Sequence, residues 1–418
     1  MADGAGDFLK DARAEAWSVP LESIDMSLRA RFLNDTMWPF FERLRKEDPV
    51  HYCADSEFGP YWSITRFNDI VEVDTNHGVF SSEGGITIAN AREDFKLPMF
   101  IAMDPPKHDA QRKAVSPIVA PAHLAVLEGL IRERAQKIFN ELPIGETFNW
   151  VDRVSIELTT QMLATLFDFP WEDRRKLTRW SDVATASEDA GIVASEEARQ
   201  EELLECAAYF TRLWNERVNA PPRGDLISMM AHSDSMRNMD PMEYLGNLIL
   251  LIVGGNDTTR NSITGGVIAL NQNPDQYQKI RGDRSLIPSM VSEIIRWQTP
   301  LAHMRRIATQ DYVMHGKTIK AGDKVVMWYV SGNRDEEVIE NPDAFIIDRE
   351  RPRHHVSFGF GIHRCVGNRL AEMQLRIVWE EILKRWHKVE VMGEPKRVPS
   401  AFVKGYESLP VRIIPLTE

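Results

Sequence analysis

The sequence predicts a mainly α-helical protein with small β-sheets. Apolar residues recur with the 3.6-residue period of a helix over long segments, notably 124–142, 154–167 and 370–386. Short β-branched or aromatic runs at 61–65, 318–319, 325–330 and 411–414 predict strands. No Gly/Ser linker, repeat or low-complexity segment divides the 418 residues, so we expect one large domain over residues 1–418.

Composition and charge narrow the classes of protein that are compatible with this chain. A net charge of −12 argues against nucleic acid as a partner, because most of the surface would repel phosphate. No apolar run approaches the roughly 20 residues that span a bilayer, so we expect no membrane span. The three cysteines Cys53, Cys206 and Cys365 form no C-x-x-C pair, which argues against a zinc cluster or a disulfide framework. Free cysteines are typical of the reducing cytoplasm, where we expect the protein to act.

The segment 357–367, SFGFGIHRCVG, is a glycine-rich loop that ends at a single cysteine before a predicted helix. Glycines such as Gly359 and Gly367 allow the backbone to approach a flat, bulky group, and backbone N–H groups near the sulfur of Cys365 would stabilise its anion. Phe358 is placed to exclude water from the sulfur. The alternative is a buried structural thiol in a turn, which is common for free cysteine.

The segment 245–270 is apolar on nearly all sides up to Asp257, which predicts a helix in the middle of the protein. Its centre contains Gly254 and Gly255, each of which weakens a helix by about 1 kcal/mol. Asp257 and Thr258 follow, where burial of polar groups is costly. A threonine hydroxyl bonded to the backbone can open a local bulge, which would leave a groove for small molecules. The alternative is a close helix contact at the glycines, with Asp257 and Thr258 capping a break.

Two further pairs have helical spacing. Glu293 and Arg296 lie three residues apart and can form an ion pair on one face, although most such pairs are exposed and contribute little. His108 and Arg112 lie one helical turn apart after a proline pair. Two donors on one face suit a carboxylate, and arginine is the favoured partner for such groups. Either residue alone would more commonly be an ordinary surface side chain.

Taken in order along the chain, these motifs resemble those of the cytochrome P450 family. The F-x-x-G-x-x-x-C-x-G pattern from Phe358 to Gly367 is similar to the family's haem-binding loop, and Gly255-Asn-Asp-Thr258 and Glu293-x-x-Arg296 resemble its other characteristic segments. The resemblance implies the triangular P450 fold, with haem b between a distal and a proximal helix. It also implies that Cys365 ligates the iron through its thiolate.

The resemblance implies roles for the other motif residues. Asp257 and Thr258 would relay protons on the distal side of the haem. Glu293 and Arg296 would brace the fold behind the haem rather than take part in catalysis. The haem propionates would be neutralised, and the haem loop formed, by residues of three segments: His108, Arg112, Arg306, His363, Phe358, Gly359 and Gly367.

Longer runs, such as Val253-Gly-Gly-Asn-Asp-Thr-Thr-Arg-Asn-Ser and Met327-Trp-Tyr-Val-Ser-Gly-Asn-Arg-Asp, closely resemble the soluble bacterial alkane-hydroxylase branch of the family. This implies a monooxygenase that hydroxylates the terminal carbon of a medium-chain n-alkane or fatty acid, using O2. The electrons would come from a 2Fe-2S ferredoxin and its ferredoxin reductase. A terpene or steroid hydroxylase, a peroxide-driven haem peroxygenase and a non-catalytic haem sensor are the alternatives.

The predicted substrate pocket is apolar, and each of its members is at least as compatible with an ordinary core position. The pocket residues that we expect are Ile86, Ile88, Leu250, Val253, Gly254, Leu301, Phe402 and Val403. Because the chain is acidic overall, we expect an acidic ferredoxin to dock on a local basic patch of Arg364 with Lys107 and Lys113. The acidic run 187–205 predicts a solvated helix face beside an access loop, with no chemical role.

Overall fold

The computed structural model describes residues 3–90, 93–186 and 191–416, and it is mainly helical with small sheets, as predicted. The α-helices are α1 (Asp3–Ser18), α2 (Arg29–Leu33), α3 (Trp38–Glu47), α4 (Phe67–Thr75), α5 (Lys107–Val115), α6 (Pro121–Asn140), α7 (Glu157–Phe167), α8 (Arg175–Thr185), α9 (Glu196–Val218), α10 (Leu226–Ala231), α11 (Pro241–Gln272), α12 (Pro274–Gly282), α13 (Ile287–Gln298), α14 (Tyr329–Gly332) and α15 (Asn368–Arg385). Short 3-10 turns are η1 (Leu21–Ser23), η2 (Phe100–Ala102), η3 (Ser116–Val119), η5 (Trp171–Asp173), η7 (Arg284–Leu286) and η8 (Gly361–His363), and η4 (Val151–Ile156) is a π-helical turn.

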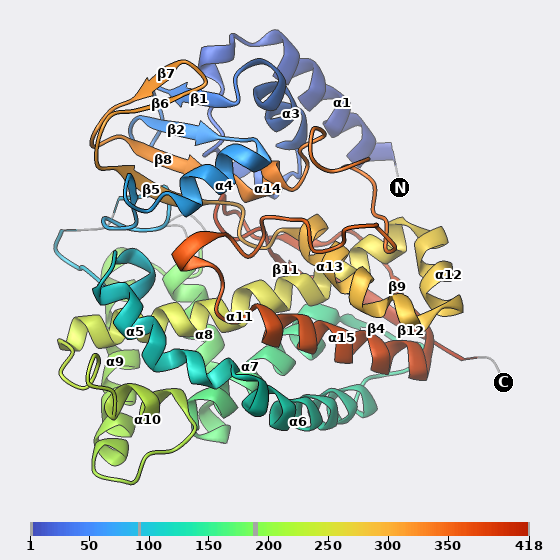
Figure 1. The fold of residues 1–418 in the computed structure, drawn as a ribbon. Coiled ribbons are helices and arrows are strands. Elements are labelled where there is room, and N and C mark those ends of the chain that lie inside the picture. Colours follow the sequence, from blue (N-terminus) through green and yellow to red (C-terminus); the bar gives the residue numbers. More distant parts are fainter. Residues whose placement is uncertain (1–2, 91–92, 187–190, 417–418) are drawn as a thin grey trace.

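The strands form four small sheets. Their bounds are β1 (Val50–Cys53), β2 (Tyr61–Ile64), β3 (Phe80–Ser81), β4 (Thr147–Asn149), β5 (Met304–Ala308), β6 (Tyr312–Met314), β7 (Lys317–Ile319), β8 (Lys324–Met327), β9 (Trp386–Val391), β10 (Lys396–Arg397), β11 (Tyr406–Ser408) and β12 (Pro410–Pro415). The largest sheet has the order β1-β2-β8-β5-β3, and β2 and β8 are parallel. It therefore joins an early segment of the chain to residues 304–327, as the blue and orange strands of Figure 1 show.

The long helix α11 crosses the middle of the helical part of the molecule (Figure 1). It begins with Pro241 after the side chain of Asp240, which accepts a hydrogen bond of 2.9 Å from the backbone N–H of Met242. Its first half contributes Leu245, Leu248 and Ile252 to one apolar cluster, and its second half contributes residues such as Val267 to another. The predicted central helix is confirmed, but it is helical without interruption, so the predicted bulge does not form.

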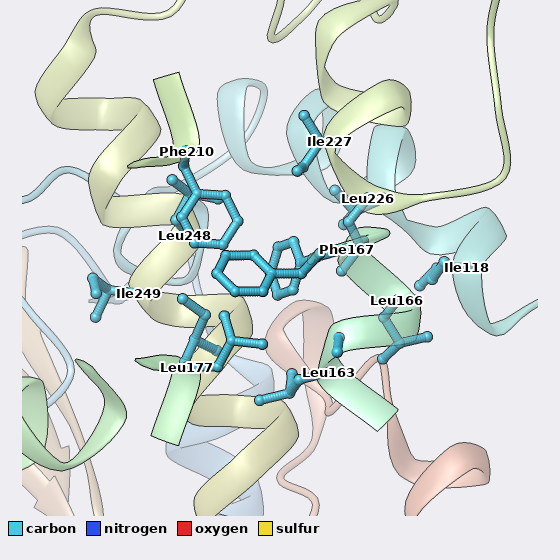
Figure 2. Close-up of a cluster of buried hydrophobic side chains, with 14 of the residues drawn as sticks. Ile118, Leu163, Leu166, Phe167, Leu177, Phe210, Leu226, Ile227, Leu248 and Ile249 are labelled. Carbon is cyan, nitrogen blue, oxygen red and sulfur yellow. The ribbon is translucent and has the colours of Figure 1, made fainter. Parts of the chain in front are cut away.

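Figure 2 shows part of the first cluster, in which side chains of α7, α8, α9 and α10 pack against α11. Phe167 and Phe210 lie edge to face at its centre, with ring centroids 5.3 Å apart. Leu166, Leu226 and Ile249 belong to this cluster and also line the main cavity. The cavity wall is therefore continuous with the hydrophobic core, which fixes its shape.

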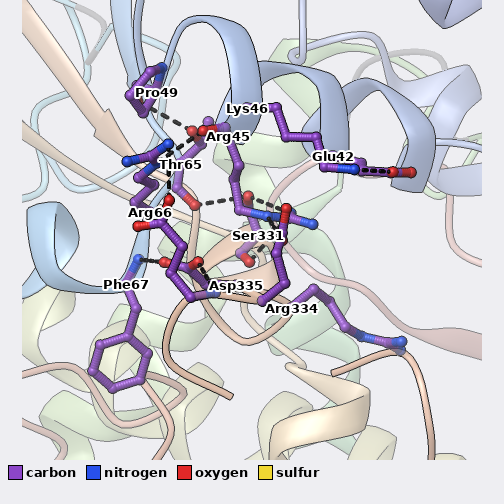
Figure 3. A network of polar contacts seen from close by, with 12 residues as sticks. Glu42, Arg45, Lys46, Pro49, Thr65, Arg66, Phe67, Ser331, Arg334 and Asp335 are labelled. Atoms are coloured by element: carbon purple, nitrogen blue, oxygen red, sulfur yellow. Dashed lines mark hydrogen bonds and ion pairs between the residues drawn. The ribbon is translucent and has the colours of Figure 1, made fainter. Parts of the chain in front are cut away.

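Buried polar contacts tie the N-terminal helices to the segment around α14 (Figure 3). Arg45 Nη1 donates to Ser331 Oγ at 3.0 Å, and Ser331 Oγ donates to the carbonyl of Thr65 at 2.8 Å. The backbone N–H of Phe67 donates to Asp335 Oδ2 at 2.8 Å, next to the start of α4. Helix α4, which packs against the turn η8 of the cysteine loop, is thereby held in place.

No single helix in the described ranges is long and apolar enough to cross a membrane. The helical stretches Lys107–Val119 and Pro121–Asn140 meet that criterion only when they are counted together across a bend of 47°.

Candidate functional site

A cavity of about 1170 Å³ lies between α11 and the loop that carries Cys365. Gly254 and Thr258 of α11 line one side, and Cys365, Val366 and Gly367 line the other. Cys365 is the only one of the three cysteines in the described residues that is exposed, and its exposed surface faces this cavity. The glycine-threonine segment of α11 and the cysteine loop, which are distant in sequence, therefore face each other across one space.

The backbone positions the sulfur of Cys365 at the cavity. The N–H of Cys365 donates to the carbonyl of Phe358 at 2.8 Å, which closes the loop on itself. Burial is the largest effect on the Cys365 thiol and raises its pKa, and the backbone N–H of Gly367 and then the positive charges of Arg112 and Arg364 oppose this shift. These three groups stabilise a thiolate, which is the form that binds a metal.

The glycines of the loop differ in what they contact. Gly359 and Gly361 have φ of +65° and +66°, and a Cβ on Gly361 would lie 2.5 Å from the carbonyl oxygen of Asp74 in α4. Gly361 therefore allows the loop to pack against protein, whereas Gly359 also lines the cavity. Gly367 differs, because a Cβ built there meets no atom within 4 Å and the residue lines the cavity.

Asp74 of α4, which no sequence motif indicated, holds the cysteine loop in position. Its Oδ2 accepts hydrogen bonds from the N–H of Phe360 at 2.7 Å and from the hydroxyl of Tyr329 at 2.9 Å. Its Oδ1 accepts a bond of 2.7 Å from Arg306 Nη2. Burial raises the pKa of Asp74, and Arg306 opposes this shift. One carboxylate thereby orients both the cysteine loop and Arg306.

The four residues expected at the haem propionates lie close together, but they differ in their position relative to the cavity. Arg112, Arg306 and His363 line the cavity, whereas His108 is buried behind His363, with ring centroids 4.2 Å apart. His108 Nε2 and both ring nitrogens of His363 have no hydrogen-bond partner among the described residues. Burial, and then the charge of Arg306, lowers the pKa of His363 to about 2. Unpartnered polar atoms beside two arginines fit a buried anionic group.

Thr258 and Asp257 face opposite sides of α11. Thr258 Oγ1 donates to the carbonyl of Gly254 at 2.9 Å and lies at the cavity. Asp257 is completely buried and points toward α8, where Ser181 donates to its Oδ1 at 3.1 Å and Thr185 donates to its Oδ2 at 3.3 Å. Thr185 also lines the cavity, so this residue contacts both the buried carboxyl and the cavity.

The electrostatic environment of Asp257 includes an arginine that the sequence analysis did not single out. Arg260 Nη2 lies 3.0 Å from Asp257 Oδ1 and 2.6 Å from Asp182 Oδ1, whose side chain is 31% exposed. Burial raises the pKa of Asp257, and the charge of Arg260 is the largest opposing effect. The spacing of three between Asp257 and Arg260 was visible in the sequence, but the contribution of α8 was not.

Glu293 and Arg296 form a fully buried pair, contrary to the usual surface location of such spacing. Arg296 Nε and Nη2 donate to Glu293 Oε2 and Oε1 at 2.8 and 2.7 Å. Arg296 Nη1 also donates to the carbonyls of Asn333 and Pro342, both at 2.8 Å. The pair thus fixes the segment that precedes the cysteine loop.

Six of the eight predicted pocket residues line the cavity: Ile86, Leu250, Val253, Gly254, Leu301 and Phe402. The prediction is wrong for Ile88, which belongs to the buried cluster that contains Trp328. Residues 86–89 form bends and not a strand, so Ile86 and Ile88 do not share a face. The prediction is also wrong for Val403, which lies in a β-bridge with Leu301 and, as the neighbour of Phe402, points the other way.

The position of the acidic run 187–205 also differs from the solvated helix face that we expected. Residues 187–190 lie outside the described residues. Beyond them, Ser195 caps α9 by accepting a bond of 3.2 Å from the N–H of Ala198, and Glu196 and Arg199 line the cavity. The start of α9 is therefore part of the cavity wall rather than only a solvated face.

Comparison with known proteins gives the family. A model of the family described as "Cytochrome P450" matches residues 224–405. The chain is 36% identical to linalool 8-monooxygenase of Pseudomonas putida over 90% of this chain and 95% of that protein. It is 49% identical to cytochrome P450-153 from Novosphingobium aromaticivorans, covering 93% of this chain and 99% of that chain with a TM-score of 0.87. It is 51% identical to CYP153D17 from Sphingomonas sp. PAMC 26605, with coverage of 93% and 98% and a TM-score of 0.87. The predicted fold is confirmed, and the chain belongs to the cytochrome P450 family of monooxygenases.

Proposed function

We propose that this enzyme hydroxylates the terminal carbon of a linear aliphatic chain, a medium-chain n-alkane or fatty acid. The observation that carries the proposal is the cavity itself, which has Cys365 and Thr258 on opposite sides and a lining that is mainly apolar. Leu250, Val253 and Phe402 offer no polar group that would orient a polar substrate near the cysteine. The resemblance to the alkane-hydroxylase branch supports the same class of substrate.

The residues present fit haem b. Cys365 would ligate the iron, and Arg112, Arg306 and His363 would neutralise the propionates, with His108 supporting His363 from behind. Phe358 and the glycines Gly359 and Gly367 would shape the loop around the sulfur. When bound, the haem supplies the activation of O2 for insertion of one oxygen atom into a C–H bond, which thiolate ligation favours.

The chain's own residues would supply protons and exclude water. The buried Asp257 has a raised pKa and can carry a proton, and the Thr185 hydroxyl lies between it and the cavity. The Thr258 hydroxyl, held by Gly254, would present the proton at the cavity surface. Apolar side chains around the substrate would keep other water molecules away from the reacting carbon.

Electrons would come from a 2Fe-2S ferredoxin with its reductase, and docking would use the surface near Cys365. Arg364 and Lys113 are exposed there, and the charges of Arg353, Arg364 and Arg369 all lower the pKa of Glu372, so they lie close together. Lys107 fits this patch less well, because it pairs with Glu243 at 2.8 Å. Replacing Arg364 by Glu should slow reduction by ferredoxin and weaken its salt dependence, and unchanged values would remove the docking assignment. We also propose that the protein acts in the cytoplasm, where free cysteines are typical.

The decisive experiment on substrate class is a titration of the purified haem protein with n-alkanes, fatty acids, linalool and steroids. Binding is read from the shift of the haem from low spin to high spin. We expect linear chains to give the largest shift, followed by terminal hydroxylation with ferredoxin, reductase and NADH. A larger shift and faster turnover with a terpene or a steroid would replace the proposal by that alternative. Efficient product formation with hydrogen peroxide alone would instead indicate a peroxygenase.

A further inference from the structure

A second, smaller cavity of about 230 Å³ adjoins the main one, with Arg305 and Asn90 in the walls of both. Asn90 lines it together with residues of strands β1, β2, β5 and β8 of the five-stranded sheet. Lys324 of β8 lines it together with Arg305 of β5. Both cations are mostly buried, with exposed fractions of 5% for Arg305 and 8% for Lys324.

Neither of these two cations has an acidic partner among the described residues. Arg305 Nη1 donates to the carbonyl of Ala89 at 2.9 Å and to Asn90 Oδ1 at 3.2 Å, and its buried Nε has no partner. Lys324 Nζ donates to the carbonyls of Phe58 and Ile88 at 2.7 and 2.9 Å. Asp323 also lines the small cavity, but it accepts from Trp62 Nε1 and from the N–H of Lys320 and forms no ion pair with either cation. Two buried cations without a counter-ion are costly, which indicates a site for an anion.

The other lysines and arginines that line the main cavity have acidic partners among the described residues, with the exception of Arg112. Arg306 pairs with Asp74, Arg199 with Glu196 and Lys96 with Glu93. Arg112 has no ion pair among the described residues, but it lies beside Cys365, whose thiol pKa its charge lowers. Arg305 and Arg306 are neighbours on strand β5, so their side chains point to opposite faces of the sheet. Arg305 is therefore separate from the group that we assign to the propionates.

Arg305 also lines the main cavity, as do the exposed residues Asn90 and Lys96. Leu250, Leu301 and Cys365 line the same cavity. A chain with its terminal carbon at Cys365 can therefore have its other end at Arg305 within one cavity.

We infer that Arg305 and Lys324 bind the carboxylate of a fatty acid whose terminal methyl group lies over Cys365. This inference rests on the proposed function and narrows it from aliphatic chains in general to chains with a carboxylate at the far end. The paired donors of Arg305 suit a carboxylate, and Lys324 adds a second charge. Burial, and then the charge of Arg305, lowers the pKa of Lys324 to about 8, a shift that a bound anion would oppose.

The test compares dodecanoate, dodecanol and dodecane in the haem protein by the spin-state titration. We expect dodecanoate to bind about tenfold more tightly than dodecanol. Arg305→Gln should remove this advantage and leave dodecanol unchanged, and Lys324→Gln should reduce it. Lys320→Gln is the matched control, because Lys320 is an exposed lysine of the same region that pairs with Asp311 and lines neither cavity.

A second readout follows the carboxylate itself. With [1-13C]dodecanoate, the carboxyl resonance of the bound chain should move in Arg305→Gln and not in Lys320→Gln. Equal affinity of the wild-type protein for dodecanoate and dodecanol would overturn the inference. So would an equal loss of both ligands in Arg305→Gln, since Arg305 would then only hold the 84–90 segment.

Failure of the inference and failure of the proposed function look different. If dodecane binds and is hydroxylated at its end while dodecanoate has no advantage, only the carboxylate site is wrong. If no linear chain binds, both are wrong. Acetate that strengthens the binding of dodecanol, without any preference for dodecanoate, would show that the site takes a free carboxylate and would overturn the assignment to the substrate.

Discussion

Arg260 holds the carboxyl group of Asp257 through an ion pair of 3.0 Å that is almost completely shielded from solvent, with 7% of the Arg260 side chain and none of the Asp257 side chain exposed. The same guanidinium reaches Asp182, which is partly exposed, at 2.6 Å. The pair therefore connects the buried acid to the outer surface of α8, while Thr185 connects it to the cavity.

Replacement of Asp257 by Asn should slow product formation by about 100-fold, because the amide retains the shape of the side chain but cannot carry the proton. The measurement is steady-state hydroxylation with ferredoxin, reductase and NADH. Substrate binding, read from the spin shift, should remain near that of the wild type. Asp182→Asn is the control at the solvent end and should have a smaller effect. A wild-type rate for Asp257→Asn would exclude it from proton transfer.

Replacement of Thr258 by Ala should uncouple turnover, since the hydroxyl held by Gly254 is lost from the cavity surface. NADH consumption should continue while hydrogen peroxide accumulates in place of hydroxylated product. Thr258→Ser retains the hydroxyl and should remain largely coupled. If Thr258→Ala gave as much product per NADH as the wild type, the role of this hydroxyl would be wrong.

Replacement of Glu293 by Gln should lower the free energy of unfolding by about 3–5 kcal/mol, because it leaves buried Arg296 without its counter-ion. Arg349 Nε, which lies 2.9 Å from Glu293 Oε2, would lose the same partner. Urea unfolding followed by circular dichroism measures the change. The exposed pair Lys279–Asp348 is the comparison, and Lys279→Gln should cost less than about 1 kcal/mol. Similar small losses for both variants would show that the buried pair does not brace the fold.

Phe402 and Val403 are adjacent residues that differ in their access to the cavity. Phe402→Ala should enlarge the cavity and reduce the affinity for medium-chain alkanes by about 1–3 kcal/mol, with bulkier ligands affected less. Val403→Ala should lower stability without changing the order of preference among ligands. The spin-state titration of both variants with the same ligands measures this, and an altered preference in Val403→Ala would contradict the assignment of the wall.

The sequence predicted the parts of this protein that consist of local motifs. The central helix, the cysteine loop and the facing of Thr258 toward the cavity follow from residue types at fixed spacing. Asp74 was not predicted, because its contacts with Phe360 and Arg306 join segments more than two hundred residues apart. The small cavity of Arg305 was missed for the same reason.

The pocket walls show a second reason why the sequence did not predict every site residue. Ile88 and Val403 were predicted from apolar character, but the direction of a side chain depends on local backbone geometry, which bends at residues 86–89 and alternates at 402–403. Single sequences do not specify such bends. The glycines of the cysteine loop were identified correctly as special positions, although Gly361 packs on α4 and not on a ligand.

The proposed function depends on ligation of the haem iron by the thiolate of Cys365 in the main cavity. The most direct measurement is the carbon-monoxide difference spectrum of the reduced, purified protein, recorded for the wild type and for Cys365→His. We expect the wild type to show the Soret maximum characteristic of thiolate ligation and Cys365→His to lose it. A wild-type protein without haem, or a Cys365→His variant that retains the thiolate-type maximum, would contradict the claim.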